Sequence, residues 1–205
     1  MKMNNNFIAP TIFTFNLLLS LLVLSSCSGQ TSKESQTLHN EDFGWTITIP
    51  EDFVNVSPEE WKKMQNKGLD AIENTYGEEV VNQSKIVFVF KNADFNYMES
   101  NYQPFDTQID GDYLESWSGV NEIVFETFRS QMPNARIDSI SSVEKVSGLD
   151  FHTFKIKIDF PNGMIMHSLM YSRLFDKKEF SLNIIYVDEK QGEKMIDAWF
   201  NSRFE

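Results

Sequence analysis

The chain has 205 residues and is acidic, with 18 Lys and Arg against 30 Asp and Glu and a formal net charge of −12. This balance argues against nucleic acid as a partner, because such binding depends on basic side chains that neutralise phosphates. Binding to anionic lipid through a basic patch is disfavoured for the same reason. The single cysteine leaves no internal disulfide to stabilise the fold.

The N-terminus has the pattern of an export signal. Lys2 precedes an apolar run over residues 17–24, and two small serines come before Cys27. The order Leu-Ser-Ser-Cys resembles the lipobox of bacterial lipoproteins. By that resemblance, a signal peptide over residues 1–26 is removed and Cys27 Sγ receives a diacylglycerol, with further acylation of the freed amine. Two or more acyl chains hold a protein stably on a bilayer.

Two other interpretations of this segment stay open. Residues 7–24 could form an uncleaved transmembrane helix, which needs about 17–25 apolar residues, although Pro10 and Asn16 weaken that interpretation. Cys27 could also be a chance thiol after an ordinary cleavage site. We favour the lipoprotein, which places the protein in the bacterial cell envelope, anchored to the membrane by lipid and facing the periplasm or the exterior.

A polar segment separates the signal from the rest of the chain. Residues 27–42 lack apolar periodicity, which predicts a lipidated and flexible tether. A single folded domain is expected over residues 43–205, a length that suits one domain. Alternating side chains over residues 44–49 predict its first strand, which Pro50 ends.

Two helices with a loop between them are expected in the middle of the chain. The first runs from a cap at Ser57 to a stop at Gly77. The second covers residues 112–132 and is ended by Pro133. Residues 93–107 mix asparagines with aromatic side chains, which predicts a loop that leads into a short strand.

The last third of the chain predicts a meander of three antiparallel strands. It follows an irregular extended segment over residues 137–146, and its turns are expected at Asn162-Gly163 and at residues 177–178. In this register the apolar side chains of all three strands lie on one face of the sheet. The facing pairs of the first hairpin are Phe160 and Ile165, Ile158 and His167, Ile156 and Leu169, and Phe154 and Tyr171. A final helix follows Asp188, so the fold class is α+β: an antiparallel β-sheet with helices packed on it.

This layout resembles the PsbP-like family, an α-β-α sandwich found in an extrinsic photosystem subunit and in bacterial lipoproteins. Four features carry the resemblance. They are the opening strand and turn over residues 45–53, the helix after a phenylalanine-rich strand, the segment 146–150 before a long strand, and a closing helix that ends in residues 199–204. The resemblance implies a non-catalytic binding or assembly module. The ion-related role of the photosystem subunit is not carried over, because no motif here matches it residue by residue.

Two surfaces are candidates for contact with a partner. Met164, Met166 and Met170 alternate with serines on the face opposite the predicted core, and methionine suits adaptable binding surfaces. Aromatic side chains in the predicted loop could anchor a partner, namely Phe95, Tyr97, Tyr102 and Phe105. The simpler alternatives are that a helix covers the methionines and that the aromatic side chains fill the edge of the core.

Metal binding has one acidic candidate. Asp106, Asp110 and Asp112 could offer oxygen ligands to calcium, but their spacing does not match an EF-hand, and helix capping explains them more simply. In the predicted register His152 and His167 lie on the same face about 20 Å apart, too far to share a metal ion. We therefore expect no metal and no cofactor, with calcium as the alternative.

The sequence contains no motif of a known catalytic site. It has no Gly-x-Ser-x-Gly elbow and no phosphate-binding glycine loop. The leading hypothesis is a lipid-anchored, exported, non-enzymatic protein that binds another protein of the envelope. The alternatives are an envelope hydrolase, whose catalytic residues would assemble from distant parts of the chain, and a small-ligand or cation-binding protein.

Overall fold

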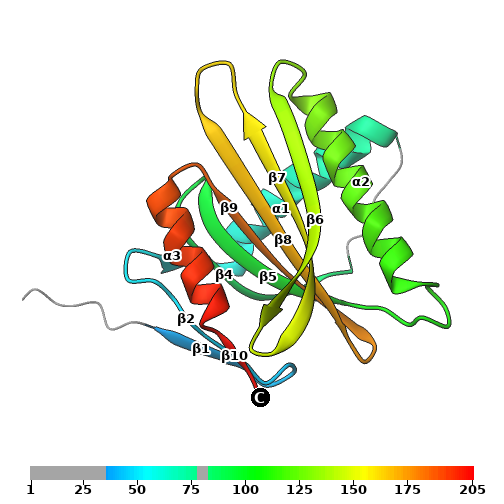
Figure 1. The fold of residues 1–205 in the computed structure, drawn as a ribbon, viewed down its shortest axis with the longest axis vertical. Coiled ribbons are helices and arrows are strands. Elements are labelled where there is room, and N and C mark those ends of the chain that lie inside the picture. Colours follow the sequence, from blue (N-terminus) through cyan, green and yellow to red (C-terminus); the bar gives the residue numbers. More distant parts are fainter. Residues whose placement is uncertain (1–35, 78–82) are drawn as a thin grey trace, which may run out of the picture. The chain divides into compact units, whose positions relative to one another are not determined.

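The computed structural model describes residues 36–77 and 83–205 (Figure 1). The helices of this part are α1 Pro58–Tyr76, α2 Tyr113–Gln131 and α3 Glu189–Phe200. The strands are β1 Thr37–Asn40, β2 Trp45–Thr48, β3 Val54–Asn55, β4 Lys85–Ala93, β5 Asn96–Pro104, β6 Arg136–Val146, β7 Leu149–Asp159, β8 Ile165–Phe175, β9 Lys178–Tyr186 and β10 Arg203–Phe204. The predicted signal peptide and Cys27 lie outside the described residues. Within the described ranges, no helix has the length and apolar character that a membrane span requires.

The helices begin where their capping residues place them. Ser57 Oγ accepts a hydrogen bond from the Glu60 amide at 3.2 Å, and Gly77 closes α1 with a left-handed φ of 74°. The side chains of Asp112 and Asp188 cap α2 and α3 in the same way. These caps satisfy backbone amides that a helix end leaves without partners. The predicted starts of all three helices are confirmed.

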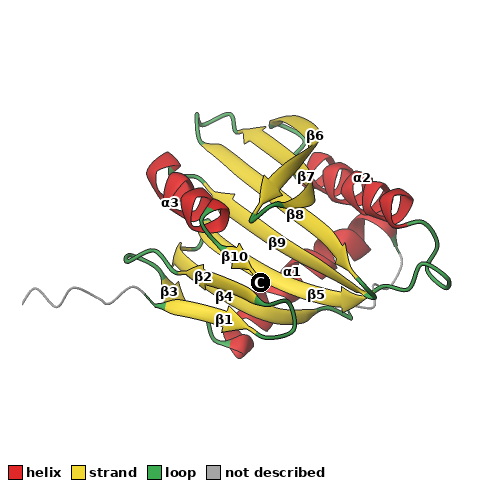
Figure 2. Ribbon diagram, turned by 60° about the horizontal axis from the view of Figure 1, so that its bottom comes forward, coloured by secondary structure: helices red, strands yellow, loops and turns green. Residues whose placement is uncertain are grey.

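Seven strands form one antiparallel sheet in the order β3-β4-β5-β9-β8-β7-β6, and a small sheet has the order β1-β2-β10. Helix α3 and the small sheet lie against one face of the large sheet, named here the α3 face (Figure 2). Helices α1 and α2 lie against the other, named the α1–α2 face. This arrangement confirms the predicted α+β class.

The α3 face carries an aromatic core. Trp45, Phe180 and Trp199 are 0% exposed, and the ring centroid of Phe180 lies 5.1 Å from that of Trp45 and 6.4 Å from that of Trp199. Phe151 and Phe204 add further ring contacts to the same group. Large aromatic side chains contribute much of the apolar area that a core removes from water. This core therefore fixes α3 and the small sheet on the large sheet.

The α1–α2 face carries a second apolar core, which lies beneath α2. Phe154, Ile156 and Ile158 of β7 are buried there with Met166 of β8. Apolar side chains of α2 cover them, namely Trp117, Val124, Phe125 and Phe128. The meander therefore divides its apolar side chains between the two faces of the sheet.

The predicted pairing of β7 with β8 is wrong by one residue. Phe160 N donates to Met164 O at 2.9 Å, so the loop consists of residues 161–163 and is one residue longer than predicted. Its last residue is a glycine with a φ of 85°, the left-handed conformation that a three-residue hairpin loop needs. Ile158 therefore pairs with Met166. Because a slip of one residue turns every side chain to the other face, Phe154, Ile156 and Ile158 of β7 lie on the α1–α2 face.

The turn between β8 and β9 also differs from the prediction, but it leaves the faces unchanged. It consists of Asp176 and Lys177, with Asp176 at a φ of 51°. Tyr171 therefore pairs with Leu182, two positions from Ile184, which a turn at residues 177–178 predicts as its partner. An even shift keeps each side chain on its own face. Phe180, Leu182, Ile184 and Tyr186 of β9 share the α3 face with Tyr171, as predicted.

Three segments that were predicted to be irregular contain strands. Strand β1 lies inside the predicted tether over residues 27–42 and pairs with β2, so ordered structure begins before Phe43. Strand β5 occupies most of the predicted loop over residues 93–107 and pairs with β4 and β9. The segment over residues 137–146 belongs to β6, an edge strand paired with β7 along its whole length. In each case a neighbouring strand supplies the hydrogen bonds, and of these pairings only that of β5 with β9 joins segments distant in the sequence.

Candidate functional site

A row of polar side chains crosses the α1–α2 face. The strand pairing places on this face Glu99, Asn101 and Gln103 of β5, Glu179, Ser181 and Asn183 of β9, and Ser168 and Ser172 of β8. Glu99 pairs directly with Asn183, and the side chains of Glu99, Ser168 and Ser172 are buried. Burying a polar group costs free energy unless it is hydrogen-bonded. Several side chains of this row hydrogen-bond one another, as Gln103 and Ser172 do with Glu179 at 2.7 and 2.9 Å.

Two adjoining hollows lie between this polar row and the two helices; together they are named the α1–α2 cavity. The polar hollow has a volume of 630 Å³, and its lining includes Glu99, Asn183, Ser168, Met170, Trp61, Tyr97 and Phe95. The apolar hollow has a volume of 510 Å³, and its lining includes Leu69, Ala71, Ile72, Val120 and Met132. The hollows share Gln65, Gly68, Val124 and Phe128 in their walls. A ligand with a polar end and an apolar body could therefore occupy both.

Glu99 is the buried acidic group of the polar hollow. The residue is 8% exposed, and its two carboxyl oxygens accept hydrogen bonds from the side-chain amides of Asn101 (3.0 Å) and Asn183. No ion pair in the described ranges includes Glu99. Burial raises the pKa of the Glu99 carboxyl, and the two amide hydrogen bonds offset only part of that effect. The carboxyl therefore holds its proton to a higher pH than an exposed glutamate.

Two aromatic side chains lie beside Glu99 in the lining of the polar hollow. Trp61 is 4% exposed, and its ring meets that of Tyr97 edge to face with centroids 5.4 Å apart. Trp61 Nε1 is buried and has no hydrogen-bond partner. Burial, followed by the nearby Glu99 charge, raises the pKa of the Tyr97 hydroxyl. The polar hollow therefore combines an indole donor, a neutral phenol and a carboxyl group.

Helix α1 is held over the cavity by few contacts. Trp61 is its only fully buried side chain among those that the structure describes. Near the start of the helix, Glu60 pairs with Lys91 of β4 at 2.6 Å, and Lys91 also lies 3.6 Å from Asp94. Near its end, Thr75 Oγ1 accepts a long hydrogen bond of 3.5 Å from Gln131 of α2. The cavity is therefore closed by the least firmly packed helix.

The predicted aromatic surface does not form as one surface. Phe95 is 55% exposed at the turn between β4 and β5 and lines the polar hollow together with Tyr97. Tyr102 lies on the α3 face, where its ring centroid is 5.4 Å from that of Phe43. Phe105 is buried against Tyr113 at the start of α2. Two of the four predicted residues therefore reach the cavity, and two pack elsewhere.

The predicted methionine surface is largely covered. Met166 is buried in the core under α2, and Met170 is half-buried and lines the polar hollow. Met164 is 37% exposed beside the hairpin loop. The one-residue register change explains this result, because it places these side chains beside the apolar residues of β7 and not beside its lysines.

The three acidic candidates for a cation site have other partners. Asp106 accepts from Lys177 Nζ at 2.7 Å, Asp110 accepts from the Asp106 amide at 2.7 Å, and Asp112 caps α2. The Lys177 hydrogen bond lowers the pKa of Asp106. Over the described ranges, no group of three or more His, Cys, Asp or Glu side chains is placed to hold a metal ion.

The histidines lie apart, but not as predicted. His152 is on the α1–α2 face with its ring 5.5 Å from that of Trp117 of α2. His167 is on the α3 face, stacked on Tyr186 at 4.6 Å and 3.1 Å from Glu189. The prediction that they share one face is wrong, because it used the incorrect register of β7 and β8. His39 belongs to β1 and bonds Thr46 at 2.8 Å.

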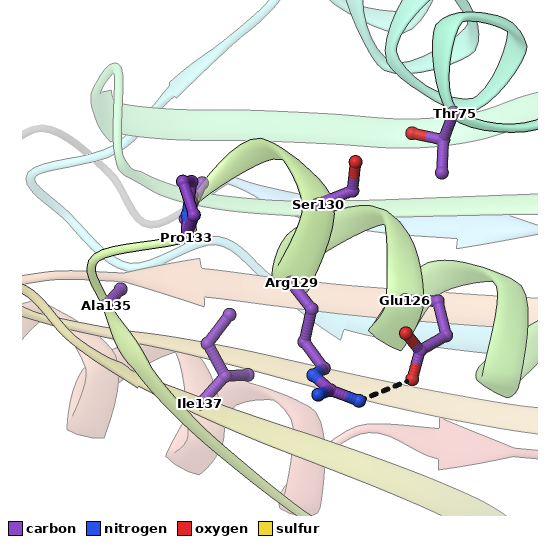
Figure 3. Close-up of a pocket in the computed structure, with 8 residues that line it drawn as sticks. Thr75, Glu126, Arg129, Ser130, Pro133, Ala135 and Ile137 are labelled. Atoms are coloured by element: carbon purple, nitrogen blue, oxygen red, sulfur yellow. Dashed lines mark hydrogen bonds and ion pairs between the residues drawn. The ribbon is translucent and has the colours of Figure 1, made fainter.

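Two other hollows in the described part of the chain have charged residues in their lining, but none of these is buried. One at the end of α2 has a volume of 700 Å³ and is lined by Thr75, Glu126, Arg129, Ser130, Met132, Pro133, Ala135 and Ile137 (Figure 3). Its two charged side chains, Arg129 and Glu126, pair with each other at 2.9 Å and are 59% and 44% exposed. A further hollow, of 670 Å³, lies between the small sheet and α3, with Glu51, Lys194, Asp197 and Arg203 in its lining. The α1–α2 cavity is therefore the stronger candidate for a binding site.

Among the described residues that line the two hollows there is one serine and no histidine or cysteine. Ser168 is the serine of the polar hollow, and no hydrogen bond from its hydroxyl to a base is found among the described residues. A serine nucleophile needs such a base.

Sequence reasoning missed Trp61, Glu99, Asn101 and Asn183 as a group. Asn183 stands between Leu182 and Ile184 in an alternating strand, which predicts that it faces solvent. Glu99 and Asn101 lie in the segment predicted as a loop. The alternation itself was the available signal, but it does not show that helices cover the polar side.

Comparisons with known proteins support the fold. The sequence matches no protein-family model and no curated protein sequence. The solution structure of cyanobacterial PsbP (CyanoP) from Synechocystis sp. PCC 6803 is similar, with a TM-score of 0.54 and 10% identity over 89% of this chain and 99% of that chain. At this identity the likeness shows the fold alone. The expected PsbP-like fold is confirmed.

A second structure is more distant. A crystal structure of a protein from Bacteroides thetaiotaomicron VPI-5482 has a TM-score of 0.39 and 9% identity over 78% of this chain. The matched region spans 45% of that protein. This likeness is too weak to support an inference about the present chain.

Proposed function

We propose that the protein is a lipid-anchored, exported, non-enzymatic binding module of the bacterial envelope, and that the α1–α2 cavity is its binding site. The anchor is inferred from the Leu-Ser-Ser-Cys order that ends at Cys27. The observation that carries the binding role is the buried Glu99 carboxyl, which lines a 630 Å³ hollow without an ion-pair partner in the described ranges. Such a group costs stability in the empty protein, so its presence supports a function in recognition.

The site favours a small molecule over the protein partner expected from the sequence. The predicted aromatic and methionine surfaces are divided between the two faces or covered by α2, whereas the α1–α2 cavity is concave and combines apolar walls with a few polar groups. Small-molecule sites share these properties. The polar row beneath the helices then has a function: it presents hydrogen-bonding groups to a ligand.

The anchor is tested by changing Cys27→Ala. The protein is expected to move from the membrane fraction to the soluble fraction, because no lipid is attached. Fractionation of cells followed by immunoblotting measures this directly. A Cys27→Ala variant that stays in the membrane fraction to the same extent as the native protein would contradict the lipid anchor.

The binding site is tested by filling the cavity. Gly68 lines both hollows, and a Cβ added there would meet no heavy atom within 4 Å. The Gly68→Phe variant is expected to lose a bound small molecule that native mass spectrometry detects on protein purified from envelopes. Gly68→Ala, which adds a single methyl group, should keep it. Native protein that carries no added mass, or Gly68→Phe protein that carries the same mass, would argue against the site.

A further inference from the structure

We infer that the α1–α2 cavity binds a small amphipathic organic ammonium ion, with its nitrogen at Glu99 and its apolar body in the apolar hollow. This inference rests on the proposed function, in which the cavity is the binding site. It adds the chemical class of the ligand and its orientation, with the nitrogen in the polar hollow and the apolar body in the apolar hollow.

The charges that line the polar hollow favour a cation. Its acidic residues are Glu60, Asp94 and Glu99, and its basic residues are Lys67 and Lys91. Lys91 is within ion-pair distance of both Glu60 and Asp94, so these two exposed acidic groups share one cation and keep a net negative charge beside the hollow. Lys67 is exposed. Glu99 is the buried acidic group of this lining and has no ion-pair partner in the described ranges, so a ligand with a carboxylate or phosphate would be repelled at that position.

The geometry at Glu99 leaves room for a donor. Each carboxyl oxygen accepts one hydrogen bond, from Asn101 on one side and from Asn183 on the other. A carboxylate has about four acceptor positions, so further donors can bind to the same oxygens. An ammonium group supplies N–H donors to these oxygens and also the positive charge that Glu99 lacks. Hydrogen bonds between charged groups are stronger than those between neutral groups.

The aromatic side chains of the polar hollow suit the same ligand. Trp61, Tyr97 and Phe95 line it together with Glu99, and a cation near an aromatic face is stabilised by the ring electrons. Trp61 Nε1 lacks a partner, although it belongs to a buried side chain that borders the cavity. Trp199 Nε1 also lacks one, but that ring lies among other aromatic rings of the α3 face. Of these two tryptophans, only Trp61 borders the α1–α2 cavity.

The apolar hollow accounts for the rest of the ligand. Its wall is formed mainly by aliphatic side chains of α1 and α2, including Leu69, Ile72 and Val120, and Phe128 is shared with the polar hollow. Val120 is 52% exposed, so an apolar chain placed against it would remove further surface from water. Each methylene group buried there is expected to raise affinity about fourfold.

The test is a titration with three probes that differ only in their polar end: hexylammonium, hexan-1-ol and hexanoate. We expect hexylammonium to bind about tenfold or more tightly than hexan-1-ol at neutral pH, and hexanoate to bind weakest. Nuclear magnetic resonance should show shifts of the side-chain amide signals of Asn101 and Asn183 only with the ammonium probe. Octylammonium should bind more tightly than hexylammonium, and butylammonium should bind more weakly.

Two variants complete the test. Glu99→Gln keeps the shape of the side chain and removes its charge, so the preference for hexylammonium over hexan-1-ol should disappear. Glu122→Gln changes an exposed carboxylate on α2 and should keep the preference. Gly68→Phe should abolish binding of all probes, and circular dichroism confirms that each variant is folded.

The outcomes separate this inference from the proposed function. Equal or tighter binding of hexan-1-ol to the native protein, or an unchanged preference in Glu99→Gln, would overturn the ammonium ligand and leave the cavity as a binding site. If no probe binds, the ammonium inference fails, and the mass carried by native but not Gly68→Phe protein decides whether the proposed function survives.

Discussion

The two faces of the large sheet show how one layer of strands can serve both stability and binding. The α3 face is an aromatic core in which Trp45, Phe180 and Trp199 are completely buried. The α1–α2 face has an apolar core only beneath α2, and next to it the polar row of β5 and β9 lies under a loosely packed helix. We infer that the α3 face contributes more to the stability of the fold. The α1–α2 face is less densely packed and therefore has room for a cavity.

One glycine in α3 and one in α1 show how much space each helix has beside its backbone. A Cβ at Gly192 of α3 would lie 2.5 Å from the Tyr186 ring, so this helix approaches the sheet as closely as its backbone allows. A Cβ at Gly68 of α1 would meet nothing within 4 Å. Helix α3 is therefore in tight contact with β9, whereas α1 has free space around Gly68.

The largest expected effect comes from removing a ring of the aromatic core. Phe180→Ala should lower the free energy of unfolding by about 3–5 kcal/mol, since the buried ring leaves a cavity among rigid neighbours. Phe128→Ala, on the wall of the α1–α2 cavity, should cost roughly half as much or less, because that ring already borders empty space. Urea denaturation measures both. Equal losses would remove the distinction between the faces.

A smaller loss is expected from crowding α3. Gly192→Ala places a methyl group against the Tyr186 ring and should destabilise the protein by about 1–3 kcal/mol, the usual range for overpacking. Thermal denaturation followed by circular dichroism gives the change. An increase in stability, as helix propensity alone would give, would show that α3 has room to move.

The Glu99 carboxyl should make stability depend on pH. Its pKa is raised in the folded state, so the folded protein holds the proton more tightly than the unfolded chain. Stability linked to this group is present at low pH and is lost as the pH rises from the ordinary glutamate value through the raised one. Glu99→Gln removes this loss, so its stability relative to the native protein should increase from acidic to neutral pH.

Denaturation of both proteins across that pH range measures the effect, with Glu122→Gln as the exposed control. Glu60, Lys91 and Asp94 also line the polar hollow, and they are unchanged in both variants. A constant difference between Glu99→Gln and the native protein at all pH values would show that Glu99 is not perturbed by burial.

The smallest expected effect is a gain on α1. Gly68→Ala should stabilise the protein by about 0.5–1 kcal/mol, because alanine favours a helix and no neighbouring atom obstructs its methyl group. This gain and the loss at Gly192 test the same substitution on two helices. Destabilisation by Gly68→Ala would mean that α1 is packed as closely as α3.

Local signals in the sequence were sufficient for the helices and the fold class. Ser57, Asp112 and Asp188 cap the helices that they were predicted to cap, because capping depends on residues only a few positions apart. The loop at residues 161–163 was more difficult. Its Asn-Gly pair suits a two-residue turn, but the preceding proline fits the first position of a longer one. Because the predicted loop was one residue too short, the prediction placed the apolar side of β7 on the wrong face of the sheet.

The site was less accessible from the sequence than the fold. Glu99 and Asn183 are 84 positions apart and meet only because β5 pairs with β9. Strand pairing across the chain brings them together, and α1 then covers them. Alternation within one strand indicates which side chains share a face, but it does not indicate whether a helix lies over that face.

The most direct test of a binding role for the α1–α2 face is to measure the pKa of the Glu99 carboxyl by nuclear magnetic resonance, with and without hexylammonium. The pKa should lie above the ordinary glutamate value of about 4.3 in the free protein, and it should fall when the ammonium ion binds, because a nearby cation favours the charged carboxylate. A Glu99 pKa that is ordinary in the free protein and unchanged by hexylammonium would contradict the account.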